Sequence, residues 1–458
     1  MNGVGHAAQG GEAAGTIRTA AVGTVAAAVG VVGAWSWRPS AVELVTPVVV
    51  VAGAAILLAL ALSRFWGFVL AALAVRASID GMGAGGVVDP ALVLGVMFLA
   101  AAAAWIVRNR DRDAQVPWSP LHWGLAGFVT AGGVSVIASE APRATVVEVV
   151  RICTTLAMFL VVGRFAVRPR HRDQVLVALA VSAAVPVLVG LAAVSLGISP
   201  FETKGEFTRL TSTFAQSNTF ARYLAVTLVA VVALHPHLTS RHRRAADLLG
   251  AGTAMCLVMT YTVGAWLAVA AGVCCVGLLQ NRRIVVATLA AVIVAFAVAP
   301  GVSARVQDAG LGVEDDADES GSFDWRLAYW SELLPLASGS PVTGIGLGAT
   351  AAVSERSKAP HNDLLAAYVE TGLFGLGAYL LLLGAAAATA RSALRREQDG
   401  IDRGVAVAFA ACCVTFAVAS LAANVMRSVA LMWWMAALAG LVVAAGRREV
   451  VPAPADAR

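Results

Sequence analysis

The chain has 458 residues, of which 59% are hydrophobic and only 13% are charged, and its formal net charge is +5. A soluble domain carries about 25% charged residues. This composition therefore leaves too little polar surface to cover a core, and it excludes an ordinary soluble protein. All six cysteines lie within apolar runs, which supports neither a disulfide framework nor a zinc site. We expect no metal, no cofactor and no nucleic-acid partner.

Apolar runs long enough to cross a bilayer recur along the whole chain. A spanning helix needs about 20 mainly apolar residues. Such runs lie near 19–37, 42–62, 65–83, 88–107, 121–138, 145–163, 174–197, 217–235, 246–262, 264–280, 284–300, 363–390, 404–422 and 428–446. The sequence predicts an all-α polytopic membrane protein with 12–14 transmembrane helices. The lower count applies if the closely spaced runs within 42–83 and 246–280 are re-entrant or broken.

Basic residues alternate between successive connections and predict the orientation. With the N-terminus inside, the inward connections hold most of the arginines: Arg64, Arg108, Arg110, Arg112, Arg164, Arg168, Arg170, Arg172, Arg241, Arg243, Arg244, Arg282, Arg283, Arg391, Arg395, Arg396, Arg403, Arg447 and Arg448. Cytoplasmic loops carry the excess of Lys and Arg. We therefore expect a multi-pass protein of the cytoplasmic membrane with both termini in the cytoplasm.

Two of the outward connections are long, and they divide the chain. The first is 198–216, and the second is a large external loop at 301–362, before the last three helices. The acidic run Glu314–Glu319 in the second loop matches no calcium-binding spacing and is interpreted as a solvated stretch whose role is open. The expected parts are an N-terminal tail (1–18), N-terminal transmembrane helices (19–197), core helices with the first external loop (198–300), the large external loop (301–362), C-terminal transmembrane helices (363–446) and a cytoplasmic tail (447–458).

Charged residues within apolar runs indicate either a site or a local ion pair, because burying a charge in the bilayer is costly. Arg222 lies one turn after Asn218, near the predicted outer end of its helix. Glu148 and Arg151 are three positions apart on one helical face, a spacing at which we expect them to neutralise each other. Arg76 and Asp80 are four positions apart near a helix end, where we expect either a similar pairing or snorkelling of the side chain to the interface.

The stretch 323–383 is the richest in polar and aromatic residues. Arg326 lies in an amphipathic segment with Trp325, Tyr329 and Trp330, a composition suited to a membrane interface. The glycine-rich run 344–348 has no preceding strand and no following Lys-Ser/Thr, so a tight turn is favoured over a nucleotide site.

His361 follows Pro360 and stands just before a long apolar helix. The positive end of the helix dipole disfavours imidazolium, so a neutral ring able to accept a proton is favoured. Position alone leaves open whether His361 acts chemically or only starts the helix.

These segments resemble the C-terminal signature of the O-antigen ligase and O-antigen polymerase superfamily, a group of many-helix membrane proteins. That signature has an Arg on an amphipathic segment, a Pro-x-x-Gly-x-Gly turn, a His-Asn-x-x-Leu motif and a Glu-x-Gly-x-x-Gly helix. The chain has Arg326, Pro341–Gly346, His361–Leu365 and Glu370–Gly375 in that order.

Two segments further upstream are also similar to the family, so the resemblance spans about 200–385. Arg209–Phe214 with Asn218 looks like the family's Arg-x-x-Gly-Thr-Phe-x-Asn-Pro-Asn segment, and Gly264–Ala268 looks like its Gly-Ala-Trp-Leu-Ala helix. The chain departs from the pattern at Ser212 in place of Gly, at Gln216 and Ser217 in place of Asn-Pro, and at Val263 before the Gly-Ala-Trp run.

The resemblance implies a glycosyltransferase, inverting and metal-independent, that moves a glycan from a polyprenyl diphosphate carrier to an acceptor hydroxyl at the outer face of the membrane. The acceptor would be a glycan, a lipid or a protein, and membrane lipid surrounds the enzyme. Arginine is suited to the leaving diphosphate because its planar fork binds phosphate in a bidentate manner. The implied roles are general base for His361, diphosphate binding for Arg209, Arg326 and Arg222, and support for Asn218, Asn362 and Glu370.

Other functions remain open at this stage. A multi-helix transporter fits the many helices and the glycine-interrupted segments, although no inverted repeat is evident and the polar residues gather at the outer side. A purely structural membrane protein leaves the basic, aromatic outer loop unexplained. The sequence does not separate ligase from polymerase, and it does not give the glycan, the acceptor, the exact helix count or the oligomeric state.

Overall fold

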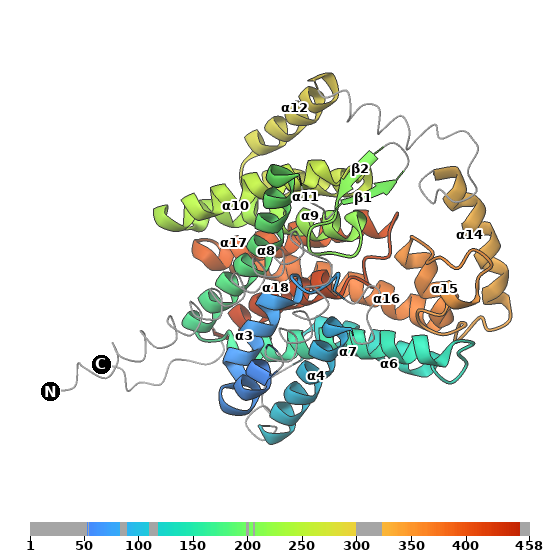
Figure 1. Ribbon diagram of the computed structural model, residues 1–458. Helices are drawn as coiled ribbons and strands as arrows, with labels where there is room; N and C mark the ends of the chain where they lie inside the picture. The colour runs from blue at the N-terminus through green and yellow to red at the C-terminus, as the bar shows by residue number, and fades with distance from the viewer. Residues whose placement is uncertain are drawn as a thin grey trace.

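The computed structural model describes residues 53, 55–82, 89–109, 118–197, 201–204, 207–298 and 323–448. The predicted N-terminal tail, the first apolar run at 19–37, the acidic run Glu314–Glu319 and nearly all of the C-terminal tail lie outside these residues. The mostly helical architecture is confirmed (Figure 1).

The first described part of the chain consists of helices, four of which begin with proline. Proline is favoured at the first helical position because an N–H group there would have no partner within the helix, so its absence costs nothing. Before α4 the Asp89 carboxylate also accepts hydrogen bonds from the N–H groups of Ala91 and Leu92. The elements are α3 (Phe65–Arg76), α4 (Pro90–Arg108), α6 (Pro120–Ser135), α7 (Pro142–Phe165) and α8 (Pro169–Leu196).

A short antiparallel hairpin follows, which the all-α prediction did not include. Strand β1 (Phe201–Lys204) pairs with β2 (Phe207–Leu210), with Glu202 opposite Arg209. The hairpin falls within the predicted first external loop, and the chain then returns to helices. These are α9 (Ser217–Leu234), the 3-10 helix η1 (His235–His237), α10 (Ser240–Met259), α11 (Val263–Leu279) and α12 (Arg282–Val298).

The last part of the chain places two helices beside a long broken one. The elements are α14 (Phe323–Ser338), α15 (Thr350–Val353), α16 (Asp363–Arg396), α17 (Gly400–Ser420) and α18 (Val429–Arg448). Helices α14 and α15 lie together at one edge of the bundle, beside the start of α16 (Figure 1).

Seven of the described helices are long and apolar enough to cross a membrane: α4, α7, α8, α9 together with η1, α16, α17 and α18. Two further apolar helices, α3 and α11, are shorter. The multi-pass architecture is therefore confirmed, and the total of 12–14 spans remains a prediction.

Helix α16 is broken at Gly372, which has φ +66° and ψ −166°. In an unbroken helix the N–H groups of residues 373 and 374 would bond the carbonyls of 369 and 370. Instead, the turn at 341–346 supplies all four partners. Ile345 and Gly346 donate to the carbonyls of 369 and 370 at 3.1 and 2.9 Å, and the N–H groups of 373 and 374 donate to the carbonyls of 341 and 342 at 2.9 and 3.3 Å. We call this pairing of 341–346 with 369–374 the Gly372 interlock.

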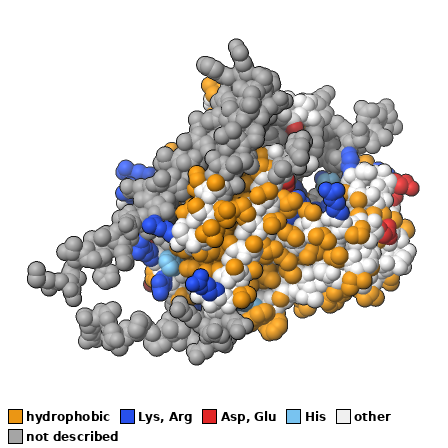
Figure 2. Space-filling model, turned by 60° about the horizontal axis from the view of Figure 1, so that its bottom comes forward, with side chains coloured by type: hydrophobic (Ala, Val, Ile, Leu, Met, Phe, Trp, Pro, Cys, Tyr) orange, Lys and Arg blue, Asp and Glu red, His pale blue; other side chains and the backbone are white. Residues whose placement is uncertain are grey.

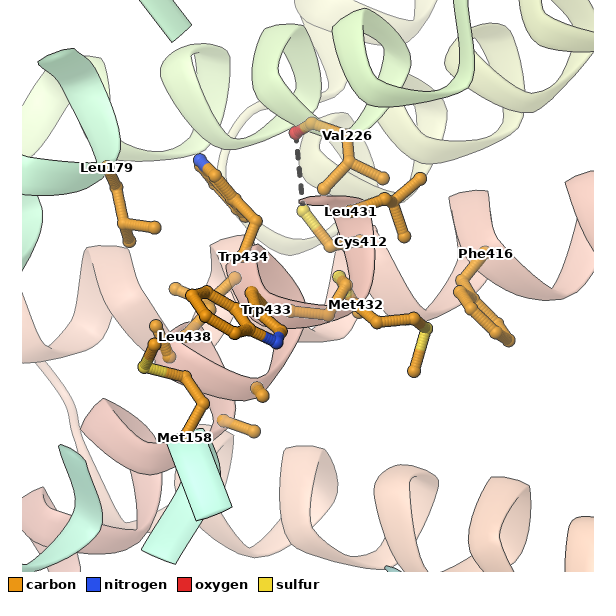
Figure 3. Packing of buried hydrophobic residues seen from close by; sticks show 14 of the residues in the cluster. Met158, Leu179, Val226, Cys412, Phe416, Leu431, Met432, Trp433, Trp434 and Leu438 are labelled. Atoms are coloured by element: carbon orange, nitrogen blue, oxygen red, sulfur yellow. Dashed lines mark hydrogen bonds between the residues drawn. The ribbon is translucent and has the colours of Figure 1, made fainter. Parts of the chain in front are cut away.

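The core lies around α18, which packs against α7 and α17. The indole side chains of Trp433 and Trp434 on α18 are buried there (Figure 3). The Trp433 indole donates to the Thr154 hydroxyl of α7 at 2.8 Å, and the Cys412 thiol of α17 contacts the Val226 carbonyl of α9 at 3.5 Å. Hydrophobic side chains also cover the middle of one outer face, with charged side chains toward its ends (Figure 2). An apolar surface of this kind is expected for contact with lipid.

Contacts between elements show which of the helix ends lie together. At one end Arg172 pairs with Asp402 at 2.9 Å, and Arg447 donates to the Gly163 carbonyl at 2.9 Å. These contacts join the start of α8 to the start of α17, and the ends of α18 and α7. The other end collects the hairpin, α14, α15 and the starts of α9, α16 and α18, and we call it the site end. Which end faces the cytoplasm remains a prediction.

Candidate active site

Arg209 and Asn218, which are predicted to be functional, lie close to one another at the site end. Arg209 on β2 is buried, and its Nη2 donates to the Tyr261 carbonyl at 2.7 Å. The next residue, Thr262, donates through its hydroxyl to the Asn218 side-chain oxygen at 3.1 Å. The connection between α10 and α11 therefore joins the hairpin to the first turn of α9.

Arg222 follows one turn later on α9, as the sequence predicts. Its Nη2 donates to the Thr219 hydroxyl at 3.2 Å. The protein desolvates the guanidinium, whose charged neighbours are Asp363 and Arg326. Among the residues that the structure describes, its buried Nε has no hydrogen-bond partner. A buried N–H of this kind is available to an anionic ligand.

Arg326 and Asn362 both bond the C-terminal end of α17. Arg326 Nη1 donates to the Ala422 carbonyl at 3.2 Å, and Asn362 Nδ2 donates to the Leu421 carbonyl at 3.2 Å. Both acceptors are carbonyls of the two residues that directly follow α17, which ends at Ser420. Helix α14 and the start of α16 are thereby fixed to the same point.

His361 lies against the aromatic face of α14. Its ring contacts Trp325 edge-on at a centroid distance of 6.4 Å, and Trp330 Nε1 donates to the Pro360 carbonyl at 2.7 Å. Its backbone has φ +55°, a left-handed conformation that costs energy in a non-glycine residue. Asn362 caps α16 through a hydrogen bond from the Leu365 N–H to its side-chain oxygen at 3.1 Å. His361 thus precedes the helix, where it was expected, and is not itself the cap.

Tyr329 holds the segment that leads to His361. Its hydroxyl lies 2.8 Å from the Ser354 hydroxyl and also donates to the Lys358 carbonyl. Burial raises the pKa of the Tyr329 phenol, so the hydroxyl keeps its proton and remains a donor.

Glu370 belongs to a neighbouring cluster rather than to the arginines named above. Its buried carboxylate accepts from the Gly348 N–H at 2.8 Å and from the Thr350 hydroxyl at 2.6 Å, and it forms an ion pair with Arg427. Glu370 therefore holds the glycine-rich turn in place, and its supporting role in the reaction remains a prediction.

The glycine-rich turn 344–348 uses its N–H groups inside the protein. Its five N–H groups donate to Ser340, Val369, Glu370 and Ser135, with Glu370 accepting twice, once through its carbonyl and once through its carboxylate. None of them is left to cradle a phosphate, so the interpretation as a tight turn and not a nucleotide site is confirmed. Gly344 and Gly346 have φ of +69° and +111°, which explains why glycines stand there.

Two charged residues at the site end had not been predicted as part of the site. Asp363 is 4% exposed and lies in the first turn of α16. Arg427 lies between α17 and α18, and its side chain keeps 23% exposure. Burial lowers the pKa of Arg427, but the carboxylates of Glu370, Glu148 and Asp363 outweigh this effect and raise it. The available signal was position alone: Asp363 directly follows His361 and Asn362, and Arg427 is the one charge in the last short connection.

The two local ion pairs expected from the sequence are confirmed. Arg76 bonds Asp80 at 2.8 Å, and Arg151 bonds Glu148 at 2.6 Å. A surface depression of about 530 Å³ opens beside Glu148 and Gly348. Within the described residues no three His, Cys, Asp or Glu side chains come together to hold a metal ion.

The spanning helices and their charged site end define a multi-pass membrane protein. Residues 248–380 match the family model described as O-antigen ligase. The chain is thus a multi-pass membrane protein in which residues 248–380 are similar to the O-antigen ligase family. The match confirms the resemblance seen in Arg326, Pro341–Gly346, His361 and Glu370, which all lie within this stretch. Arg209, Asn218 and Arg222 lie upstream of the matched stretch. Comparison with curated proteins gives no match.

Proposed function

We propose that the protein transfers a glycan from a polyprenyl diphosphate carrier to an acceptor hydroxyl at the outer face of the cytoplasmic membrane. The family implies a ligase or glycosyltransferase activity on lipid-linked glycans. The observation that carries the proposal is the gathering of Arg222, Arg326 and the His361–Asn362 segment around the end of α17.

The arginines supply the chemistry that a diphosphate leaving group needs. Negative charge grows on the bridging oxygen as the bond to the sugar breaks, and fixed positive groups that face this oxygen stabilise the transition state. Arg222 offers a buried N–H without a partner among the described residues. Arg326 comes from the aromatic helix α14, where a lipid head group at the interface is within its reach. We assign Arg209 to the same diphosphate clamp because it bonds the Tyr261 carbonyl, and the next residue, Thr262, bonds Asn218 at the start of α9.

His361 is the proposed general base. It takes the proton from the acceptor hydroxyl as the oxygen attacks the sugar, so the attacking oxygen carries no full positive charge in the product. Direct attack on the face opposite the diphosphate inverts the anomeric configuration. In this proposal the guanidinium groups provide the positive charge, and the reaction requires no metal.

A transporter is the competing function, and the broken helix α16 is the feature that favours it, because transporters bind solutes at unwound helix segments. In this chain, however, the main-chain groups released at the break bond the turn at 341–346. They are therefore occupied, and the break offers a solute no main-chain ligands at residues 369, 370, 373 and 374.

The test uses the full chain in lipid nanodiscs with a polyprenyl diphosphate-linked glycan and an envelope acceptor. We expect release of polyprenyl diphosphate and a glycosylated product with the native protein, loss of both in Arg326→Ala, and full activity in Arg143→Ala, which removes an exposed arginine of α7. Uptake of a solute into vesicles without glycan transfer would refute the proposal. In a deletion strain, shortened polymer would indicate a polymerase, and unattached polymer a ligase.

A further inference from the structure

We propose that Asp363 is a positioning residue that fixes the loop between α17 and α18. Through this loop it would position the arginine cluster, by which we mean Arg222, Arg326 and Arg427. This inference rests on the proposed function. The loop, residues 421–428, lies beyond the stretch matched by the family model. The last two helices would accordingly form part of the site rather than only part of the scaffold.

The Asp363 carboxylate bonds the loop and not its own helix. It accepts from the Ser420 hydroxyl at 2.9 Å and from the Val425 N–H at 3.0 Å, and the Met426 N–H lies 3.3 Å from the same Oδ2. The N–H of Leu365 is already capped by Asn362. Asp363 is therefore not needed as a helix cap, and its position in the first turn serves a contact between distant segments.

Loop 421–428 in turn bonds the predicted site residues. Its first two carbonyls accept from Asn362 and Arg326, each at 3.2 Å. At its far end Arg427 forms the ion pair with the buried Glu370. A shift of the loop would thus move the side chain of Arg326 and the segment next to His361 at the same time.

Charge gives Asp363 a second effect on the cluster. Its carboxylate interacts electrostatically with both Arg222 and Arg427, and Arg222 also lies near the like-charged Arg326. In its ionised form the carboxylate opposes the repulsion between Arg222 and Arg326 before the donor arrives. An amide of the same shape would lack this charge, and its NH₂ group would compete with the N–H donors of the loop.

The test measures the binding of polyprenyl diphosphate to the full chain in nanodiscs, together with turnover and thermal unfolding. We expect Asp363→Asn to weaken binding of this probe about tenfold, a typical coupling within one hydrogen-bond network, with little change in the KM for the acceptor. In the Arg222→Gln background the same substitution should add much less, because the neutral glutamine removes the electrostatic interaction with Asp363. Asp80→Asn, which neutralises an aspartate paired with Arg76 near the end of α3, should bind the probe as the native protein does.

The outcomes separate this inference from the proposed function. If Arg222→Ala and Arg326→Ala lose the probe but folded Asp363→Asn keeps native affinity, Asp363 has only a structural role and the inference is wrong. If the native protein binds no polyprenyl diphosphate, both ideas fail together. Should Asp363→Asn not fold, Ser420→Ala removes a single hydrogen bond to the carboxylate and should weaken binding about threefold; native affinity in that variant would also overturn the inference.

Discussion

At the scale of single residues, His361 gives the sharpest prediction. General-base catalysis is typically worth 10²–10⁴-fold, so we expect His361→Ala to lower turnover by about that factor while polyprenyl diphosphate still binds. Activity of the native protein should fall toward acidic pH, because a protonated imidazole cannot accept a proton, and this acid dependence should vanish in the variant.

The control for His361 is His235→Ala, which removes a histidine paired with Asp247 at 2.9 Å, at the end of the bundle opposite the site. It should retain full turnover. A different result would assign His361 another role: if His361→Ala mainly weakens donor binding and acid does not inhibit the native protein, the ring donates a hydrogen bond to the diphosphate instead.

The arginines Arg209 and Arg326 are predicted to face one cavity although they lie far apart in the sequence, and this remains a prediction. Replacing either with Ala should abolish transfer without preventing membrane insertion. Lys should restore activity only in part, because it lacks the planar fork that binds two phosphate oxygens. Transfer rates and membrane-fraction yields measured side by side would check this, and full activity of Arg209→Ala would remove Arg209 from the clamp.

At the scale of the elements, the Gly372 interlock predicts an unequal effect of two glycine substitutions in α16. At Gly372 an added Cβ would lie 2.2 Å from the backbone of Val342, and φ is +66°. Strain of this kind costs about 1–3 kcal/mol before the clash is counted. At Gly377 a Cβ meets nothing within 4 Å.

We therefore expect Gly372→Ala to lower the thermal unfolding midpoint and to impair transfer, because the turn and the start of α16 separate. Gly377→Ala in the same helix should leave both nearly unchanged. Unfolding scans in detergent would measure the difference, and equal midpoints for the two variants would show that the break is not held as described.

The same elements show which structural features could be predicted from the sequence and which could not. Spans, local ion pairs and the order of the motifs follow from patterns within one or two helical turns, so Glu148–Arg151 and the tight turn at 344–348 were predictable. The contacts of Asp363 with Val425 and of Arg427 with Glu370 join segments that only the packing of α16 against α17 brings together. No local pattern encodes them. The β1–β2 hairpin was missed because each strand is only four residues long.

At the scale of the whole molecule, the alternating arginines predict which end of the bundle faces the cytoplasm. Reporter fusions after Arg172, Arg244 and Arg396 should be cytoplasmic, and fusions near Lys204 and Glu319 should be external. The contacts already place Arg172 and the start of α17 at one end. An external signal at Arg244 would put the proposed site on the wrong face and would overturn the orientation.

The Gly372 interlock also bears on how such an enzyme changes over time. The pairing uses main-chain groups alone, so it does not depend on most of the side chains. It requires only the glycines with positive φ, which are Gly344, Gly346 and Gly372. Within the paired segments the exposed side chains of Val342, Leu373 and Phe374 can consequently be replaced without loss of these hydrogen bonds. Related proteins could therefore differ at these positions while the main-chain pairing continues to hold the turn against α16.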